Sequence, residues 1–570
     1  MGINTGVKYI GKEAVYEDNI LRTGLVWEKG ETHSLPVTMA KEFLKHPSVF
    51  QEVPGFSYLG VTSSGSGVKV LSSGGRFIPA LNFGGVPVVA VGDSITAQGQ
   101  VNGIATAWAA ANGLDTPIGL QGTQELCPTG TGSLAWSSAS RALTWTPSGL
   151  PSGAPVTVSR SGIYIIPGPG VRNGIRVGIK SNLLPISDAV GTINSSGSPS
   201  VGGTYHGYAP WAQTLSLGRM RILGNYGIQG ARTDHCVDYI KQALEENPSA
   251  VEALILIGTN DLGVLTTAQS LDNITAIANA CTAAGVLPRF VTVLPRNSLD
   301  AARSAQLHAI NRLLVSMAAA RMAKVVDAYG QLANPVDGTL ISGVSADGLH
   351  PNALGAYIVG KAVAQSYLAD YPGPARYWSG ADDTYDAATG LGNPVASIGS
   401  QPGNAGTLTT ATGVCTTGMS LKRTLGSAMA CVGSKVARLD ASSEWQRMSF
   451  SGATAEEAYQ QQSGNITVNP GEKWQGVCEV RVPNSTTNFR RADLQLRLSG
   501  AGVPSYSVTC INPSSSYLSG PSEPWTGLLV TPVIEILPGY NTLRVDLTGG
   551  TGAGGAGDVD FGRFEIRRIA

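Results

Sequence analysis

The sequence predicts a multidomain protein with an α/β domain at its centre and β-rich regions around it. Between residues 86 and 372, short apolar runs alternate with segments of helical spacing, as in a parallel sheet covered by helices. After Pro372 the helical spacing gives way to alternating apolar and polar positions. Glycine supplies 73 of the 570 residues and charged residues only 14%, against about 7% and about a quarter in typical domains. This composition favours turn-rich β structure, and the length suits about three or four domains.

Residues 1–55 are expected to form a small N-terminal module, because they are the most charged and least glycine-rich part of the chain. A short helical run is expected at residues 37–44. The stretch VKYIGKEAVYEDNI and the segments after it resemble a small domain found in phage structural proteins. Residues 56–85, which include a Gly/Ser stretch at 63–67, are expected to form a linker with some β structure.

The α/β region spans residues 86–372. Buried strands are predicted at 86–91, 220–223, 254–257, 290–294 and 324–326, where the apolar runs are nearly unbroken. Helices are predicted at 234–244, 268–284, 299–322 and 353–368. This order of elements predicts a five-stranded parallel sheet with helices on both faces.

An inserted β-rich module is predicted at residues 101–205, between the first and second strands. A structureless loop of that length is improbable in a compact domain, and strand-like pieces occur at 141–146, 156–159, 163–166 and 174–179. The insert is expected to overhang the site described below. Its residues leave open whether it forms a lid, a platform for substrate or a contact between subunits.

Residues 373–570 are predicted to form a β-sandwich. Apolar side chains alternate with polar ones at positions 494–498, 543–547 and 564–566, as in a strand with one buried face. The tryptophans of this region are equally consistent with core packing and with stacking on sugar rings; they are Trp378, Trp445, Trp474 and Trp525.

Charge and cysteine content exclude several classes of function. The 39 basic residues balance the 39 acidic ones, which is unlike a protein that binds nucleic acid or an anionic membrane. No segment has the roughly 18 uncharged apolar residues of a membrane helix, and residues 1–25 lack the apolar stretch of a secretory signal. The seven cysteines are scattered without a C-x-x-C pair, so we expect free thiols and no metal site, with pairing of Cys415 and Cys431 left open.

A nucleophile and its base are predicted at two turns of the α/β region. Ser94 follows the first strand directly, at the sheet edge where parallel strands present ligand-binding loops. A serine needs a base to become nucleophilic, and the base needs a partner that fixes its tautomer. His350 and Asp347 lie in a glycine-containing turn before the last helix, where they can supply both roles. The same turn also suits a helix cap with a surface histidine.

Two further turns offer hydrogen-bond donors for a developing oxyanion. Residues 225–230 follow the second strand with two glycines that let backbone amides approach a ligand, and Gly258-Thr259-Asn260-Asp261 follows the third strand. Both turns have a purely structural alternative. Gly227 and Gly230 can serve as turn glycines, and Asn260 and Asp261 can cap the next helix.

Taken in chain order, these four segments resemble the motif blocks of the SGNH (GDSL-like) hydrolase family. The resemblance implies a flavodoxin-like three-layer α/β/α core, with Ser94 as nucleophile, His350 as base and Asp347 as its orienting acid. It also implies an oxyanion hole formed by the Ser94 amide, Gly230 and Asn260, with no metal and no organic cofactor. The 136 positions between Ser94 and Gly230 far exceed the family's usual spacing, which places the insert between the first two blocks.

The sequence therefore predicts a serine esterase of SGNH type, acting on short-chain esters. The favoured substrate is an O-acetyl group on a bacterial surface polysaccharide, with the protein as a phage tail or virion component that contacts other tail proteins. One alternative is a non-catalytic glycan-binding adhesin or structural tail protein on a hydrolase scaffold, and a second is a lipase-type esterase. A homo-oligomer is conceivable, and the acyl group, the glycan and sugar binding by the C-terminal region stay open.

Overall fold

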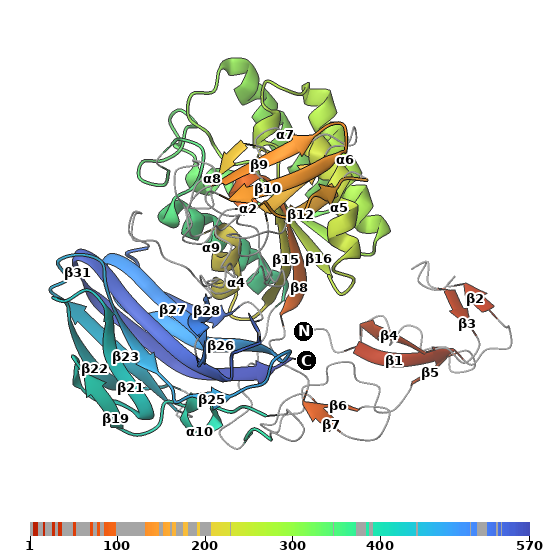
Figure 1. Cartoon of the computed structure of the whole chain (residues 1–570). Coiled ribbons are helices and arrows are strands. Elements are labelled where there is room, and N and C mark those ends of the chain that lie inside the picture. Colours follow the sequence, from red (N-terminus) through yellow and green to blue (C-terminus); the bar gives the residue numbers. More distant parts are fainter. Residues whose placement is uncertain are drawn as a thin grey trace. The chain divides into compact units, whose positions relative to one another are not determined.

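The structure is a computed structural model of the 570-residue chain (Figure 1). It describes seven short strands within residues 4–79, together with residues 85–97, 132–147, 152–159, 162–166, 175–179, 191–193, 207–228, 230–345, 347–371, 383–386, 392–439, 443–501, 503–509, 521–531, 534–536 and 538–569. The chain divides into two compact units, of which one is residues 1–82 with 371–374 and the other is residues 83–370 with 375–570.

The first unit contains only short strands among its described residues. Strand β1 (Asn4–Tyr9) pairs antiparallel with β4 (Thr32–Pro36) and β5 (Phe50–Glu52). Two hairpins complete the set, formed by β2 (Val15–Glu17) with β3 (Val26–Glu28) and by β6 (Lys69–Leu71) with β7 (Phe77–Pro79). The helical run expected at residues 37–44 lies outside the described residues.

The second unit is built on a five-stranded parallel sheet, as the sequence predicts. Its order is β15 (Met220–Gly227), β8 (Val86–Gly92), β16 (Glu252–Leu256), β17 (Leu287–Val291) and β18 (Lys324–Val326). The central residues of β8 have no exposed surface on either face, because helices cover both sides of the sheet. Strand β8, the first strand of this sheet along the chain, therefore lies between the second, β15, and the third, β16.

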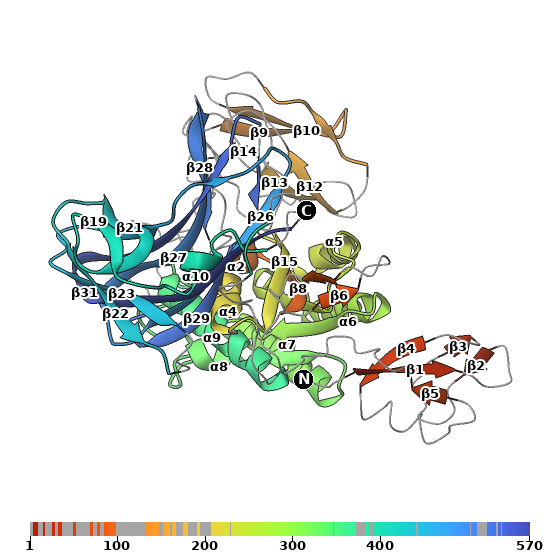
Figure 2. The same cartoon turned by 90° about the horizontal axis from the view of Figure 1, so that it is seen from below.

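Helices form the outer layers (Figure 2). Helices α5 (Thr233–Glu245), α6 (Thr267–Ala283) and α7 (Ala301–Ala319) share one apolar core with the sheet. Helices α4 (Tyr208–Leu215) and α9 (Ala353–Asp370) pack against each other on the opposite side. In the described part of the chain, no helix combines the length and apolarity needed to cross a membrane.

Several predicted elements differ from the observed ones, and two of these differences have a clear physical reason. Helix α4 was not expected, because it is only eight residues long and includes Pro210. Strand β17 ends at Val291, whereas the apolar run continues to Leu294 in a loop that is buried as deeply as the strand. Burial of that loop explains why apolar residues alone do not mark where the strand ends.

The insert contains β structure in its described segments. A four-stranded antiparallel sheet has the order β11-β10-β9-β14, and β12 pairs with β13 as a hairpin that contacts α5. The bounds are β9 (Gly132–Ser137), β10 (Ala142–Pro147), β11 (Val156–Thr157), β12 (Gly162–Ile166), β13 (Ile175–Ile179) and β14 (Gly191–Ile193). Of these, β9 and β14 were not predicted.

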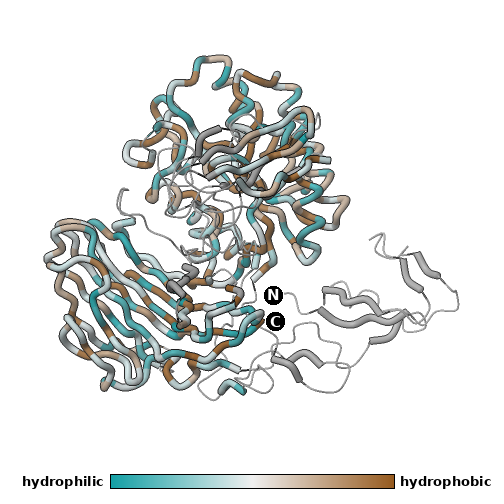
Figure 3. The backbone as a smooth tube through the Cα atoms, in the orientation of Figure 1, coloured by the Kyte–Doolittle hydropathy of each residue, from teal (hydrophilic) through white to brown (hydrophobic). Residues whose placement is uncertain are grey.

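The C-terminal region is β-rich, as predicted, and its two sheets meet at one long strand. Strand β31 (Thr542–Arg568) pairs with β24, β25 and β27 in its first half and with β23 and β26 in its second half. Hydrophobic and hydrophilic residues alternate along these strands (Figure 3). The apolar positions predicted to face inward, such as Leu496 and Val545, are fully buried.

The remaining elements of the region complete the two sheets. One sheet adds β19 (Ala405–Thr409), β21 (Cys415–Leu425) and β28 (Val503–Thr509) to β24 (Glu457–Gln462), β25 (Ile466–Thr467) and β27 (Thr487–Gly500). The other adds β20 (Thr412–Gly413), β22 (Ala430–Ala437), β29 (Trp525–Val530) and β30 (Ile534–Glu535) to β23 (Glu444–Ser451) and β26 (Lys473–Val482). A short helix, α10 (Ala396–Gly399), precedes them.

One apolar cluster joins this β region to helices α4 and α9. Trp211 of α4 packs edge-on against Tyr357 of α9 and Trp525 of β29, with ring centroids 5.1 and 5.2 Å apart. The Tyr357 hydroxyl also donates a 2.7 Å hydrogen bond to Glu523. Trp445, Trp474 and Trp525 are all buried, so core packing accounts for the three described tryptophans of the region, while Trp378 lies outside the described residues.

Candidate active site

The carboxyl ends of the three neighbouring strands β15, β8 and β16 are level with one another. Gly92, the last residue of β8, pairs in register with Gly227 of β15 and with Leu256 of β16. The turns that follow these strands therefore begin at the same edge of the sheet. They carry Ser94, Gly230 and Asn260, the residues predicted to form the nucleophile and the oxyanion donors.

A chain of hydrogen bonds links Ser94, His350 and Asp347. Ser94 Oγ lies 2.9 Å from Nε2 of His350, and Nδ1 of the same imidazole lies 2.6 Å from Oδ2 of Asp347. When Nδ1–H donates to the carboxylate, Nε2 is left to accept the proton of the Ser94 hydroxyl. Ser94 and His350 are buried, and the side chain of Asp347 is 36% exposed.

The turn before α9 holds the acid and the base in place. Oδ1 of Asp347 accepts hydrogen bonds from the backbone amides of Leu349 and His350, at 2.9 and 2.7 Å. Burial alone would raise the pKa of Asp347, but the bonds from His350 and the backbone outweigh it and lower this pKa to about 2. Gly348 has a φ of +76° and lies where a Cβ would come within 2.9 Å of Asn297, so this turn requires glycine.

Asp93 lies behind Ser94 and is fully buried. Its Oδ1 accepts a 2.9 Å hydrogen bond from the amide of Ile95, while its Oδ2 has no hydrogen-bond partner among the described residues. Burial raises the pKa of Asp93 to about 7, and the nearby carboxylate of Asp261 adds to the effect. The neighbouring backbone is fixed by a 2.7 Å bond from the Tyr239 hydroxyl to the carbonyl of Gly92.

The two turns that carry the predicted oxyanion donors are bonded to each other. Nδ2 of Asn260 donates to the carbonyl of Ala231 at 2.9 Å, which uses one of its two N–H groups and leaves the other for a ligand. The carboxylate of Asp261 accepts from the amide and the hydroxyl of Thr233, at 2.9 and 2.5 Å. Gly230 adopts a φ of +69°, a conformation that favours glycine.

This arrangement has the parts required for acyl transfer. A hydroxyl, an imidazole and a carboxylate form a relay that can remove and return one proton. Amide donors on two adjacent turns can stabilise the oxyanion that forms when the hydroxyl attacks a carbonyl. Among the residues the structure describes, no group of three or more His, Cys, Asp or Glu side chains has an arrangement suited to a metal ion.

The described cysteines take no part in this site. Cys236, Cys281, Cys415, Cys431 and Cys478 are buried free thiols. Burial raises their pKa values, which disfavours the reactive thiolate. Cys415 and Cys431, whose pairing the sequence left open, are therefore separate thiols in this structure.

Residues 192–358 match the family model of the GDSL-like lipase/acylhydrolase family. The matched residues include Gly230, Asn260, Asp347 and His350, whereas Ser94 lies on the far side of the insert. The long insert thus separates the predicted nucleophile from the contiguous segment that matches the family.

Several solved structures align with part of this chain. A GDSL-like lipase from Bacteroides thetaiotaomicron is 19% identical, covers 26% of this chain and 76% of its own, with a TM-score of 0.24. Est24, a carbohydrate acetylesterase from Sinorhizobium meliloti, is 16% identical over 31% of this chain and 91% of its own, with a TM-score of 0.26. The enzymatically active domain of tailspike protein 4 from bacteriophage CBA120 is 12% identical over 27% and 20%, with a TM-score of 0.19. No curated protein matches the sequence.

Some contacts of the candidate site could not be predicted from motifs. Asn297, in the loop after β17, donates its backbone amide to the carbonyl of Gly348 at 2.9 Å and accepts from the amide of Leu340 at 3.0 Å. Thr233, one residue before the helix predicted at 234–244, bonds to Asp261 across two turns. Both contacts join segments far apart in the sequence and belong to no periodic pattern.

Proposed function

We propose that this protein is a serine esterase. Ser94 is the nucleophile, His350 the general base and Asp347 the orienting acid. The observation that carries this proposal is the hydrogen-bonded chain from Ser94 Oγ through both imidazole nitrogens to the Asp347 carboxylate, with links of 2.9 and 2.6 Å. Such a chain activates a hydroxyl that is otherwise a weak nucleophile.

In the proposed reaction, Ser94 Oγ attacks the ester carbonyl carbon while His350 Nε2 takes the hydroxyl proton. The Ser94 amide, the Gly230 amide and the Asn260 side chain stabilise the oxyanion. His350 then gives its proton to the departing alcohol, and an acyl group remains on Ser94. Water, deprotonated by His350, hydrolyses this acyl-enzyme and restores the hydroxyl.

For the substrate we propose an O-acetyl group on a bacterial surface polysaccharide, with the protein as a virion component. Three features support this choice: the β-rich C-terminal region, the insert beside the hydrolase core, and an N-terminal sequence that resembles a domain of phage structural proteins. The N-terminal support comes from the sequence.

The test of the chemistry is the variant Ser94→Ala, assayed with 4-nitrophenyl acetate. We expect hydrolysis to fall to the background rate while the melting temperature stays the same, because the substitution removes the nucleophilic oxygen and no other heavy atom of the side chain. Unchanged hydrolysis would overturn the proposal. The matched control is Ser316→Ala, which removes an exposed hydroxyl from helix α7.

Labelling and substrate range separate the alternatives. A fluorophosphonate should label wild-type protein at Ser94, whereas a non-catalytic adhesin would stay unlabelled. Release of acetate from O-acetylated bacterial polysaccharides, compared with release of long-chain fatty acids, decides between a glycan esterase and a lipase.

A further inference from the structure

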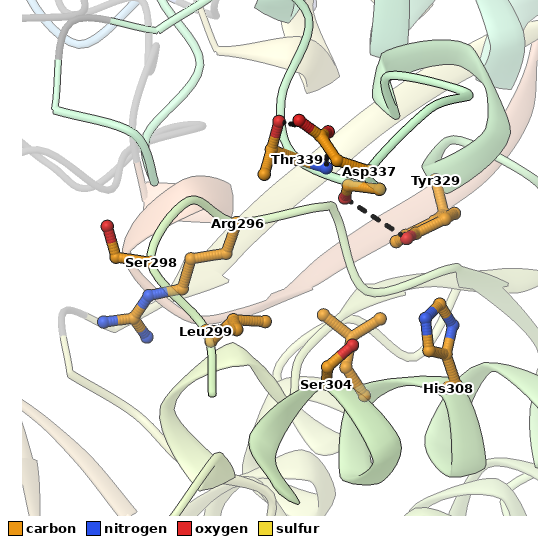
Figure 4. Close-up of a pocket in the computed structure, with 10 residues that line it drawn as sticks. Arg296, Ser298, Leu299, Ser304, His308, Tyr329, Asp337 and Thr339 are labelled. Carbon is orange, nitrogen blue, oxygen red and sulfur yellow. Dashed lines mark hydrogen bonds between the residues drawn. The ribbon is translucent and has the colours of Figure 1, made fainter. Parts of the chain in front are cut away.

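A polar cavity of about 100 Å³ is lined in part by the loop whose Asn297 bonds to the turn of Asp347 and His350 (Figure 4). Its other walls are helix α7 and α8 (Tyr329–Leu332) with the loop that follows. In Figure 4, Ser304 extends from α7 toward the loop that carries Asp337 and Thr339, with His308 and Tyr329 on one side and Arg296 on the other. A single water occupies only about 10–15 Å³ on this measure, so the cavity has room for a small ring.

The wall of the cavity is rich in hydrogen-bonding groups. Arg296 offers donors only, the carboxylate of Asp337 offers acceptors only, and the hydroxyls of Ser304 and Thr339 offer both. His308 adds an imidazole, which can donate or accept. Such a mixed set suits a molecule whose own groups both donate and accept. It does not suit an alkyl chain.

Two of these groups are held in place by their neighbours. The amide and hydroxyl of Thr339 donate to Oδ1 of Asp337 at 2.9 and 2.7 Å, so both of these bonds end on one oxygen of the carboxylate. His308 packs edge-on against Tyr329, with ring centroids 5.4 Å apart, and the Tyr329 hydroxyl donates to the carbonyl of Gly338 at 3.3 Å. A ligand would therefore meet polar groups whose positions are already set, which lowers the entropy cost of binding.

The cavity shares a wall with the turn that carries the acid and the base. Arg296 and Ser298 line the cavity, and Asn297 between them donates its backbone amide to the carbonyl of Gly348. Gly348 lies between Asp347 and His350 in sequence. The loop that lines the cavity is therefore in direct contact with the turn that holds the acid and the base.

We propose that this cavity is a subsite for one sugar residue of the glycan, next to the sugar that carries the ester. The inference rests on the proposed function, because it assumes that the acyl group is attached to a saccharide. Hydroxyls of a sugar ring both donate and accept, as the wall requires. A phosphate or sulfate group fits less well, since the carboxylate of Asp337 would repel it.

The experiment compares esters that do and do not reach the cavity. The substrates are 4-nitrophenyl acetate and a panel of partially O-acetylated oligosaccharides that are one or three sugars long. We expect wild-type protein to have a higher kcat/KM for the longer members. The variant Ser304→Phe fills the cavity, and Arg296→Ala removes hydrogen-bond donors from its wall. Each should raise KM for the trisaccharides about 10-fold, as expected for the loss of one good contact. Neither should change the hydrolysis of 4-nitrophenyl acetate.

Matched controls keep the test specific. Ser316→Phe and Arg312→Ala alter exposed residues of helix α7 that do not line the cavity. Neither variant should change the hydrolysis of 4-nitrophenyl acetate or of the oligosaccharides. Melting temperatures identify a variant that fails to fold, and Arg296→Ala remains informative if Ser304→Phe does so. A wild type that hydrolyses 4-nitrophenyl acetate but shows no length preference, or variants that keep the preference, would overturn the subsite alone. A wild type that hydrolyses neither kind of ester would overturn the proposed function.

Discussion

The two edges of the parallel sheet use charged side chains in different ways. At the edge where the strands begin, Arg289 of β17 is bound by both oxygens of Glu252 at 2.8 and 3.0 Å and by Asp370 at 2.8 Å. At the edge where the strands end, Asp347 bonds to His350, which bonds in turn to the neutral hydroxyl of Ser94. The first cluster is closed, with each charge facing an opposite one. The second ends on a group that can react.

This difference separates a stabilising ion pair from a candidate catalytic relay. A buried cation with two carboxylates has no further bond to make, and its loss should affect folding. A relay that ends on a hydroxyl has one proton to pass on, and its loss should affect rate. Substitutions at the two edges should therefore move different observables.

The largest effect on rate among these substitutions is expected for Asp347→Asn. The amide keeps an acceptor for the backbone, but it no longer stabilises the imidazolium and no longer selects the reactive tautomer. We expect kcat for 4-nitrophenyl acetate to fall about 10³-fold or more, with little change in melting temperature. Asp272→Asn, at an exposed carboxylate on α6, should have no effect. A loss below tenfold would argue against this role for Asp347.

The low pKa of Asp347, about 2, gives this relay a pH signature. Because the folded-state pKa lies below the ordinary value, the carboxylate stays ionised until the pH falls toward 2. The carboxylate should therefore remain available as the hydrogen-bond acceptor of His350 at any pH well above 2. In the pH–rate profile of the wild type we expect no separate loss from Asp347 between pH 4 and 7.

A smaller loss of rate is expected for Asn260→Ala, which removes an oxyanion donor. Loss of one such donor costs about 10²–10³ in kcat. Steady-state kinetics with 4-nitrophenyl acetate should show this loss mostly in kcat and not in KM, since the oxyanion exists only in the transition state. An unchanged kcat would remove Asn260 from the proposed oxyanion hole.

At the opposite edge, Glu252→Gln should leave the rate unchanged and lower stability. The substitution takes away the charge that compensates buried Arg289, and breaking a buried pair in this way costs about 3–5 kcal/mol. Urea unfolding should measure this loss. A large fall in kcat without a fall in stability would contradict the contrast between the two edges.

For Asp93→Asn, the expected effect concerns the dependence of stability on pH. The pKa of Asp93 is raised by burial to about 7. For a raised carboxylate pKa, the stabilising contribution is complete below the unfolded value of about 4 and is lost as the pH rises through about 7. The free energy of unfolding of the wild type should therefore decrease over this range. The Asn variant should show a flatter profile in urea titrations between pH 4 and 8.

The sequence was sufficient for the sheet and for the meeting of Ser94 with His350, because parallel topology brings strand ends to one edge whatever lies between them. The roles of these residues in catalysis remain a prediction. The sequence did not predict Asn297 against Gly348 or the position of His308 in a cavity wall. Neither contact follows from a local period, since each depends on how distant loops pack. For the same reason, the burial of Trp525 against Trp211 could not be decided in advance.

The apolar cluster that joins α4 and α9 to the C-terminal sheets has a consequence for evolution and for engineering. Domains connected only by a flexible linker can be separated and recombined without exposing buried apolar surface. Here a cut after residue 374 would leave Trp211 and Tyr357 facing water, and would strip the C-terminal sheets of two helices they pack against. Any hybrid in which another domain replaces the C-terminal region therefore needs an apolar surface that fits α4 and α9.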